Sequence, residues 1–444
     1  MSDIKFSAHQ TEAGDFERVV LVHQAPRASS EDMDELDGLA RAAGGVVIER
    51  LVSTRSHPVA ATLLGRGKIQ ELHEIVESND ITLVIVDQDL TPIQERNLER
   101  GLECRVIDRT RLILDIFALR ATTSEGKFQV ELAQLRHMST RLVRGWTHLE
   151  RQKGGIGLRG PGETQLESDR RMLGNRIRTL KNRLDKVESQ RQLRRRGRNR
   201  TPIPTVSFVG YTNAGKSTLF NTLTGANVYA KDELFATLDP TMRRYQAGTG
   251  DPVVLSDTVG FISRLPHNLV KAFHSTLEEV IDATLLLHVI DISDVDWRDR
   301  KADVEAVLAD IGADEIPRFE IYNKCDQAGL SPERSAVSEA IPEKLVVSAV
   351  SGEGIDLLEE ALADYFSRHR EHRKIFLPSD AGRLRAQIYD HCQVLSEIVD
   401  DTGVIVLELD LGPRESGWLQ SHEDFKPAYF NETEDFCIKN SQIS

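Results

Sequence analysis

Two short motifs, about a hundred residues apart, carry the chemistry that this sequence can perform. Gly210-Tyr-Thr-Asn-Ala-Gly-Lys-Ser217 has the spacing of a phosphate-binding loop, G-x-x-x-x-G-K-S. Asn323-Lys-Cys-Asp326 has the pattern of a loop that reads a guanine base. The two motifs in this order predict a protein that binds and hydrolyses GTP.

The first motif follows an apolar run, Thr205 to Val209, which favours a strand that leads directly into the loop. Backbone N–H groups of such a loop wrap the phosphates, and the helix that follows adds the positive end of its dipole. Lys216 would reach the β and γ oxygens, and the Ser217 hydroxyl would ligate Mg²⁺. We expect the nucleotide to contact all eight residues: Gly210, Tyr211, Thr212, Asn213, Ala214, Gly215, Lys216 and Ser217.

A second acidic motif follows the apolar run Val253 to Leu255, at the place where another carboxylate must approach the metal. There Asp257 would hold Mg²⁺ through water, and the Gly260 N–H would sense the γ-phosphate. The predicted contacts in this motif are Asp257, Thr258, Val259 and Gly260.

The guanine-reading residues are expected at the ends of two further strands. Asp326 accepts hydrogen bonds only, so it would pair with the ring N–H and the amine of guanine and reject adenine. Asn323 would brace the loop and Lys324 would lie over the base, while a backbone N–H near Ser348 would bind the guanine carbonyl. The predicted contacts are Asn323, Lys324, Cys325, Asp326, Ser348, Ala349 and Val350.

Charge and composition predict where the protein acts. The net charge is −14, but residues 141–200 hold 18 lysines and arginines against 6 acidic residues, which indicates one basic surface and a polyanionic partner. The chain shows no apolar run of about 18 residues and no secretion signal at its start, so we expect a cytoplasmic protein with no transmembrane segment. Its four cysteines show no C-x-x-C pair and predict no metal site.

Hydrophobic periodicity predicts a multi-domain α/β protein. Residues 1–120 alternate strands (19–22, 46–52, 83–87 and 104–107) with helices (30–43, 68–78 and 91–101) and form an N-terminal α/β domain. Residues 121–200 form a basic helical hairpin. Its first helix continues a helical pattern from 109 to about 144, a glycine-rich loop covers 153–163, a second helix covers 164–193, and a flexible linker covers 194–204. The GTPase domain covers 201–368. Residues 369–444 form a small C-terminal domain, with strands 374–377 and 404–410 around a helix 381–399, and a loosely ordered tail after about 415.

The nucleotide motifs resemble translation-factor-like GTPases with the Ras fold, and other segments narrow the resemblance to the bacterial HflX family. These segments are Leu64-Gly-Arg-Gly-Lys-Ile, Gln129-Val-Glu-Leu-Ala-Gln-Leu, Gly154-Gly-Ile-Gly-Leu-Arg-Gly-Pro-Gly-Glu and Phe235-Ala-Thr-Leu-Asp-Pro-Thr. The resemblance covers about residues 17 to 365. It implies a Ras-like P-loop GTPase domain in the Obg-HflX-like branch.

The resemblance also implies the moving parts of the site. The first switch would be Phe235, Ala236, Thr237, Leu238 and Asp239, with Thr237 closing onto Mg²⁺ and the γ-phosphate, or Thr241 in its place. The catalytic residues would be Lys216, Thr237 and Gly260, and the metal ligands Ser217 and Thr237. Phe261 stands where Ras-type enzymes place a water-orienting glutamine, which predicts slow hydrolysis that a partner stimulates. Asn213 either helps to bind K⁺, as in related GTPases, or stabilises its own turn.

HflX-like proteins bind the large ribosomal subunit and are implicated in splitting stalled or idle ribosomes. The resemblance therefore implies this subunit and its RNA as partners of a protein that is monomeric when free. The expected RNA contacts are Lys153, Gly154, Gly155, Gly157, Arg159, Gly160, Arg170 and Arg171. Two alternatives remain: a ribosome-assembly or RNA-modification GTPase, and a signalling GTPase with a protein partner.

Overall fold

A computed structural model describes residues 17–25, 30–55, 57–146, 161–198, 203–226, 234–246, 252–263, 274–335, 343–368, 371–400, 403–422 and 424–430 of the chain. Contacts divide the chain into two compact units. The first holds residues up to Lys186 together with Tyr229–Asp239 and Ile262–Thr276, and the second holds the rest. The domain boundaries at 120, 200 and 368 stay predictions.

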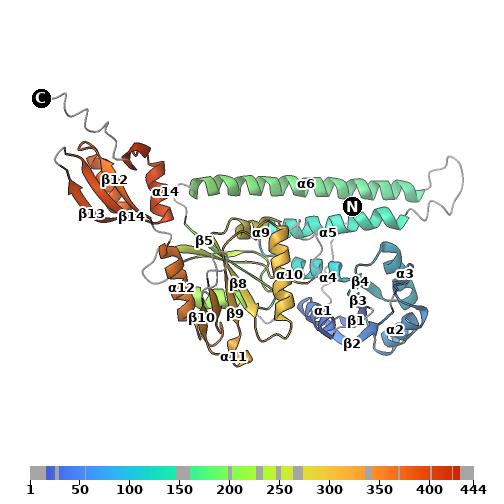
Figure 1. Cartoon of the computed structure of the whole chain (residues 1–444). Coiled ribbons are helices and arrows are strands. Elements are labelled where there is room, and N and C mark those ends of the chain that lie inside the picture. The colour runs from blue at the N-terminus through green and yellow to red at the C-terminus, as the bar shows by residue number, and fades with distance from the viewer. Residues whose placement is uncertain are drawn as a thin grey trace. The chain divides into compact units, whose positions relative to one another are not determined.

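The N-terminal part of the first unit is built on a parallel four-stranded sheet of order β2-β1-β3-β4 (Figure 1). Strands β1 and β3 are buried runs rich in Val, Leu and Ile, whereas β2 is mostly half-buried or exposed, with Val46 42% exposed. Because β1 lies between β2 and β3, right-handed connections place α1 and α4 on one face of the sheet and α2 and α3 on the other. The elements are β1 (Arg18–Gln24), α1 (Ser30–Ala42), β2 (Val46–Ser53), α2 (Arg66–Ser78), β3 (Leu83–Val86), α3 (Pro92–Leu102), β4 (Arg105–Asp108) and α4 (Arg109–Arg120).

The helical pattern expected from 109 to 144 is interrupted in the structure. Helix α4 ends at Arg120, and α5 (Ser124–Trp146) begins four residues later. The side chain of Thr123 caps the new helix, because its hydroxyl accepts the N–H of Gly126 at 3.0 Å. The helical pattern of the sequence alone did not reveal this break.

Helix α6 (Pro161–Arg198) is longer than predicted at both ends. Pro161 suits a first helical turn, where its missing N–H costs nothing, so the expected loop 153–163 is wrong over 161–163, and its other residues lie outside the described part of the chain. The linker expected at 194–204 is wrong over 194–198, where the arginine run continues the helix through Gly197. A single glycine lowers helix stability by only about 1 kcal/mol, which arginines around it offset with their high helix propensity.

Helices α5 and α6 pack side by side through a small hydrophobic core of Leu132, Leu135 and Leu180 (Figure 1). Arg176 on α6 forms an ion pair with Glu131 on α5, and the guanidinium of Arg183 lies 5.4 Å from the ring centroid of Phe128. No helix within the described residues is both long enough and apolar enough to cross a membrane.

The second unit contains a seven-stranded sheet of order β10-β11-β9-β8-β5-β7-β6, in which β10 and β6 pair antiparallel at the two edges (Figure 1). Phe208, Leu287 and Phe319 are fully buried in its core. Its elements are β5 (Thr205–Gly210), α7 (Lys216–Thr224), β6 (Thr241–Tyr245), β7 (Val253–Asp257), α9 (His274–Ile281), β8 (Leu285–Asp291), α10 (Trp297–Asp310), β9 (Arg318–Asn323), α11 (Cys325–Ala328), β10 (Glu333–Ser335), β11 (Lys344–Val346) and α12 (Ile355–Arg368).

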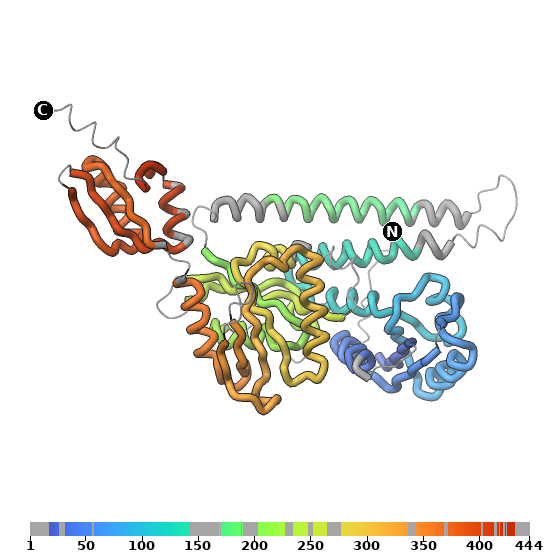
Figure 2. The backbone as a smooth tube through the Cα atoms, viewed as in Figure 1, coloured from blue at the N-terminus to red at the C-terminus, as the bar shows by residue number. Residues whose placement is uncertain are grey.

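The C-terminal part of the second unit is an antiparallel three-stranded sheet of order β12-β14-β13, traced in orange to red in Figure 2. The helix predicted over 381–399 is wrong in its second half, where 393–399 form a strand that pairs antiparallel with β14. The expected tail after 415 is also wrong as far as residue 430, since Leu419, Phe425 and Tyr429 are buried in this core. The elements are β12 (Glu371–Leu377), α13 (Gly382–His391), β13 (Gln393–Val399), β14 (Ile405–Leu411), α14 (Pro413–Ser421) and the 3₁₀ helix η1 (Pro427–Phe430).

Replacing Leu180 by Ala should destabilise the helical pair by about 2–5 kcal/mol, because it opens a cavity in a core with few residues. The matched control is Met172→Ala on the same helix, which is 49% exposed and should cost less than about 0.5 kcal/mol. Urea unfolding of both variants measures the difference. Equal costs at the two positions would contradict the packing described.

Candidate nucleotide-binding site

The phosphate-binding loop joins the end of β5 to the start of α7, as predicted. Two of its glycines occupy positions that no other residue fits. A Cβ on Gly210 would lie 2.3 Å from the carbonyl oxygen of Val289, and one on Gly215, whose φ is +94°, would lie 2.2 Å from Asn323 Nδ2. The loop therefore turns tightly against its neighbours and leads into the N-terminus of α7, where the positive end of the helix dipole suits a phosphate.

Lys216 is buried and bends back over the loop. Its Nζ donates hydrogen bonds to the carbonyl oxygens of Gly210 and Tyr211, at 3.1 and 2.8 Å. Burial lowers the pKa of Lys216 to about 8, although the charge of Asp257 opposes this shift. A phosphate group at the loop would supply the negative charge that favours the ammonium form.

Ser217 and Asp257 meet at the start of α7 and the end of β7. The Ser217 hydroxyl donates a hydrogen bond to Asp257 Oδ2 at 2.6 Å, and Asp257 is fully buried. A hydroxyl and a carboxylate in contact are hard oxygen donors of the kind that Mg²⁺ prefers. The residues present therefore fit a magnesium ion that phosphate oxygens would share.

The segment after Asp257 lies directly on the phosphate loop. A Cβ on Gly260 would approach both Lys216 Nζ and the Thr212 Cα to 2.9 Å. Phe261 donates its N–H to the Gly210 carbonyl at 3.1 Å and accepts the Thr212 N–H at 2.6 Å. Its ring is 2% exposed, so Phe261 fastens the backbone here and offers no polar atom of its side chain to orient water.

Asn323 connects the phosphate loop to the base-reading loop. Its Nδ2 donates to the Ala214 carbonyl and its Oδ1 accepts the Ala349 N–H, both at 2.9 Å. The N–H of Cys325 in turn donates to the Val347 carbonyl at 3.2 Å. One buried amide therefore sets the spacing between three segments that come from the ends of β5, β9 and β11.

The remaining residues predicted to contact the base lie near Asn323 in the sequence or at the ends of neighbouring strands. Asp326 is exposed, Ser348 is buried and Val350 is 80% exposed. Lys324 Nζ lies 2.7 Å from Asp291 Oδ2 at the end of β8. Sequence reasoning did not identify Asp291, although its place after the apolar run Leu285–Ile290 was a usable signal.

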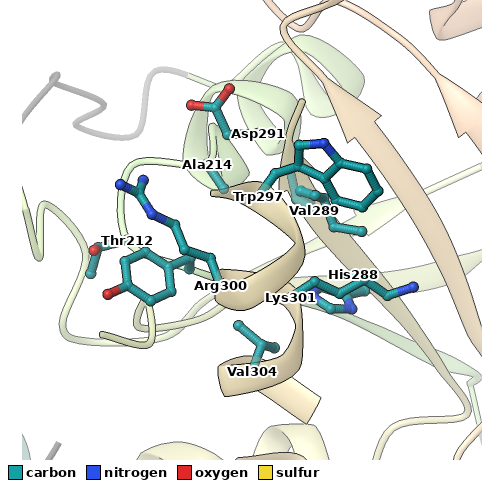
Figure 3. A pocket seen from close by; sticks show the side chains of 11 residues that line it. Thr212, Ala214, His288, Val289, Asp291, Trp297, Arg300, Lys301 and Val304 are labelled. Carbon is teal, nitrogen blue, oxygen red and sulfur yellow. The ribbon is translucent and has the colours of Figure 1, made fainter. Parts of the chain in front are cut away.

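Sequence reasoning also did not identify the support behind the phosphate loop. Figure 3 shows a small cavity lined by Tyr211, Thr212 and Ala214 from the loop and by residues of β8 and α10. The guanidinium of Arg300 on α10 lies 5.2 Å from the ring centroid of Tyr211. His288 also lines this cavity and is buried. Burial lowers the pKa of its imidazole to about 3, so the ring is neutral at pH 7.

The predicted switch residues Phe235, Ala236, Thr237, Leu238 and Asp239 belong to the first unit, and their role toward Mg²⁺ stays a prediction. Thr241, the alternative, opens β6. Of the predicted RNA contacts, Arg170 and Arg171 are exposed on α6. Lys153, Gly154, Gly155, Gly157, Arg159 and Gly160 lie outside the described residues.

The structure brings together the loop 210–217, the motif 257–260, the motif 323–326 and the segment 348–350 at the carboxyl ends of neighbouring parallel strands. In open α/β sheets this edge is where nucleotides bind. The fold and the site define a P-loop GTPase.

Comparison with known proteins agrees with this class of protein and identifies the family within it. Family models match the chain in four segments: "GTP-binding GTPase N-terminal" over 30–118, "GTP-binding GTPase Middle Region" over 120–198, "50S ribosome-binding GTPase" over 205–324 and "HflX C-terminal domain" over 335–426. GTPase HflX from Escherichia coli is 50% identical over 396 residues, which cover 88% of this chain and 93% of that protein. GTPase HflX from Magnetococcus marinus is 45% identical over 392 residues, which cover 87% and 90%.

The chain therefore belongs to the HflX family of GTPases, as its motifs predicted. Among solved structures, a GTP-binding protein from the archaeon Sulfolobus solfataricus in complex with GDP is 23% identical. The match covers 78% of this chain and 98% of that one, with a TM-score of 0.43.

Replacing Asn323 by Ala should weaken the binding of GTP and GDP alike by at least about tenfold, because it leaves a buried carbonyl and a buried N–H without their partner. Titration with a fluorescent guanine nucleotide measures this. Asn97→Ala is the control, because Asn97 also donates to one backbone carbonyl, that of Ala61 at 2.9 Å, but lies in the N-terminal part of the chain. A loss confined to one nucleotide would contradict the bracing role.

Proposed function

We propose that this GTPase acts on the large ribosomal subunit, and that its GTP-bound form splits stalled or idle ribosomes in the cytoplasm. The observation that carries the proposal is the exposed basic face of α6, where Arg170, Arg171, Arg178, Lys181 and Lys186 all face solvent. Positive charge along one helix suits the phosphates of structured RNA, which dominate affinity. The family model that matches 205–324 is described as a 50S ribosome-binding GTPase, which supports the same partner.

In this proposal the ribosome is split because the GTP-bound form has a higher affinity for the large subunit than the form that remains after hydrolysis. GTP favours a conformation that binds the large subunit, binding excludes the small subunit, and hydrolysis returns the protein, monomeric when free, to a weakly binding form. Lys216 would neutralise charge on the β and γ phosphates, the Gly260 N–H would sense the γ-phosphate, and Ser217 and Thr237 would hold the magnesium. Mg²⁺ supplies charge neutralisation between the phosphates when it is bound.

The site supports a low intrinsic rate of hydrolysis. Phe261 is buried and its polar backbone atoms are occupied by Gly210 and Thr212, so no side chain at this position orients water. We therefore propose that the ribosome reorders the site and stimulates turnover. Asn213 is exposed with a φ of +63°, which suits both of its expected roles, the K⁺ contact and the turn-stabilising side chain.

Purified protein should hydrolyse GTP at least about tenfold faster with large ribosomal subunits than alone, since partners of related GTPases act through charge stabilisation worth several orders of magnitude. Small ribosomal subunits are the matched control and should not stimulate. Deleting Gly154–Gly162 should abolish the stimulation. Equal rates with and without large subunits would contradict the proposal, and stimulation only by precursor particles would indicate an assembly factor.

Replacing Asp326 by Asn should shift base preference from guanine toward xanthine by at least about a hundredfold, because an amide N–H can donate to the carbonyl that xanthine has in place of the guanine amine. Competition binding between GTP and xanthosine triphosphate measures the shift. A variant that keeps its preference for GTP would show that Asp326 does not read the base.

A further inference from the structure

The carboxylate of Asp239 is held at the break between α4 and α5. Both of its oxygens accept hydrogen bonds from two adjacent threonines. Thr122 donates its N–H at 2.9 Å and its hydroxyl at 2.6 Å, and Thr123 donates its N–H at 2.8 Å and its hydroxyl at 2.6 Å. Burial raises the pKa of Asp239, but these four hydrogen bonds outweigh it and hold the pKa below the usual range. The Asp239 carboxylate is thus a charged acceptor that receives four hydrogen bonds at the start of α5.

Thr123 has two roles in this arrangement. Its hydroxyl donates to Asp239 Oδ1 and also accepts the N–H of Gly126, which is the capping bond of α5. Gly126 itself leaves room for the carboxylate, because a Cβ there would lie 2.4 Å from Asp239 Oδ1. The start of α5 is therefore shaped around Asp239.

The residues before Asp239 are held by packing in the same unit. The Phe235 ring is 2% exposed and meets the ring of Phe117 on α4 edge to face, with centroids 4.7 Å apart. Phe235 adopts a φ of +56°, a strained conformation for an aromatic residue that persists only where surrounding contacts impose it. Leu234 lies against Gly38 of α1, where a Cβ would approach its Cδ1 to 3.0 Å. Thr237 therefore stands between two anchors, Phe235 and Asp239.

A second set of polar contacts holds Ser263, which lies close to the end of the nucleotide motif 257–260. Ser263 lies three residues after Gly260. Arg109 donates to the Ser263 carbonyl at 3.1 Å, and the Ser263 hydroxyl donates to Glu35 Oε1 at 2.8 Å. Arg109 is itself fixed by Asp87, a fully buried carboxylate 2.8 Å away at the end of β3. The segment 235–239 and Ser263 are thus both held by residues of the N-terminal part of the chain.

From these contacts we propose that Thr122 and Thr123 are positioning residues of the GTPase, which hold the segment 235–239 in the conformation of the GDP-bound form. In the GTP-bound form Thr237 would help to hold the magnesium, and the movement that brings it there would break the hydrogen bonds to Asp239. The contacts therefore lower the affinity for GTP relative to GDP. By linkage, GTP releases the start of α5 and so reports the nucleotide state to the helical pair α5–α6. The inference rests on the GTPase assignment and on the predicted role of Thr237, not on the ribosomal partner.

The test measures the ratio of affinities for a non-hydrolysable GTP analogue and for GDP in purified full-length protein without ribosomes. Thr122→Ala and Thr123→Ala should each raise the ratio in favour of the analogue by about three- to tenfold, the effect of losing one hydrogen bond to a charged group. Thr122→Ser keeps the hydroxyl and should restore the original ratio. Ser263→Ala, which removes the bond to Glu35, should change the ratio in the same direction through the second contact.

Thr140→Ala is the matched control, because Thr140 lies on α5 and its hydroxyl donates only to the His137 carbonyl, at 2.7 Å, among the contacts described. It should leave the ratio unchanged. Thermal unfolding of each variant shows that it folds, and Thr122 is exposed and does not cap the helix, so its variant keeps the test valid if Thr123→Ala unfolds. A ratio that stays constant or falls in Thr122→Ala would overturn the proposal. Because no ribosome is present, that result would leave the proposed partner untouched.

Discussion

Backbone segments approach one another very closely around the phosphate loop. The geometry of the nucleotide site follows from this close approach. Gly210 lies against β8, Gly215 against Asn323, and Gly260 against Thr212 and Lys216, each with no room for a Cβ. Three strands and two loops can meet at one point only because these residues have no side chain. The same closeness buries Lys216 and places Ser217 within 2.6 Å of Asp257, so the chemistry follows from the packing.

Local sequence signals predicted most of this site because it is built from short motifs at the ends of buried strands. The glycines of 210–215 and the carboxylate Asp257 follow runs rich in apolar residues, the amide Asn323 follows a predicted strand, and parallel strands bring such positions to one edge of the sheet. The break between α4 and α5 was not predictable in this way. Thr122 and Thr123 lie within a segment that was predicted as one continuous helix, and their partner Asp239 lies more than a hundred residues away.

The wrong predictions for the later elements of the chain have the same physical cause, because packing between distant residues overrides local sequence signals. Propensity predicted a linker where arginines extend α6 to Arg198, and a helix where residues 393–399 pair with β14 as strand β13. The burial of Leu419 and Tyr429 depends on a sheet that forms from distant strands, so polarity around them pointed to a tail. The contacts of Phe235 also come from packing, since nothing next to it in sequence indicates that its ring meets Phe117.

In the proposal above, Asp239 couples the nucleotide state to the start of α5. The most direct measurement is hydrogen–deuterium exchange at the backbone amides of Thr122 and Thr123, which donate to Asp239. Exchange should be faster with a GTP analogue and magnesium than with GDP, while the amide of Ala121, which donates to the Phe117 carbonyl, stays unchanged. Equal exchange at Thr122 and Thr123 in both nucleotides would contradict the account.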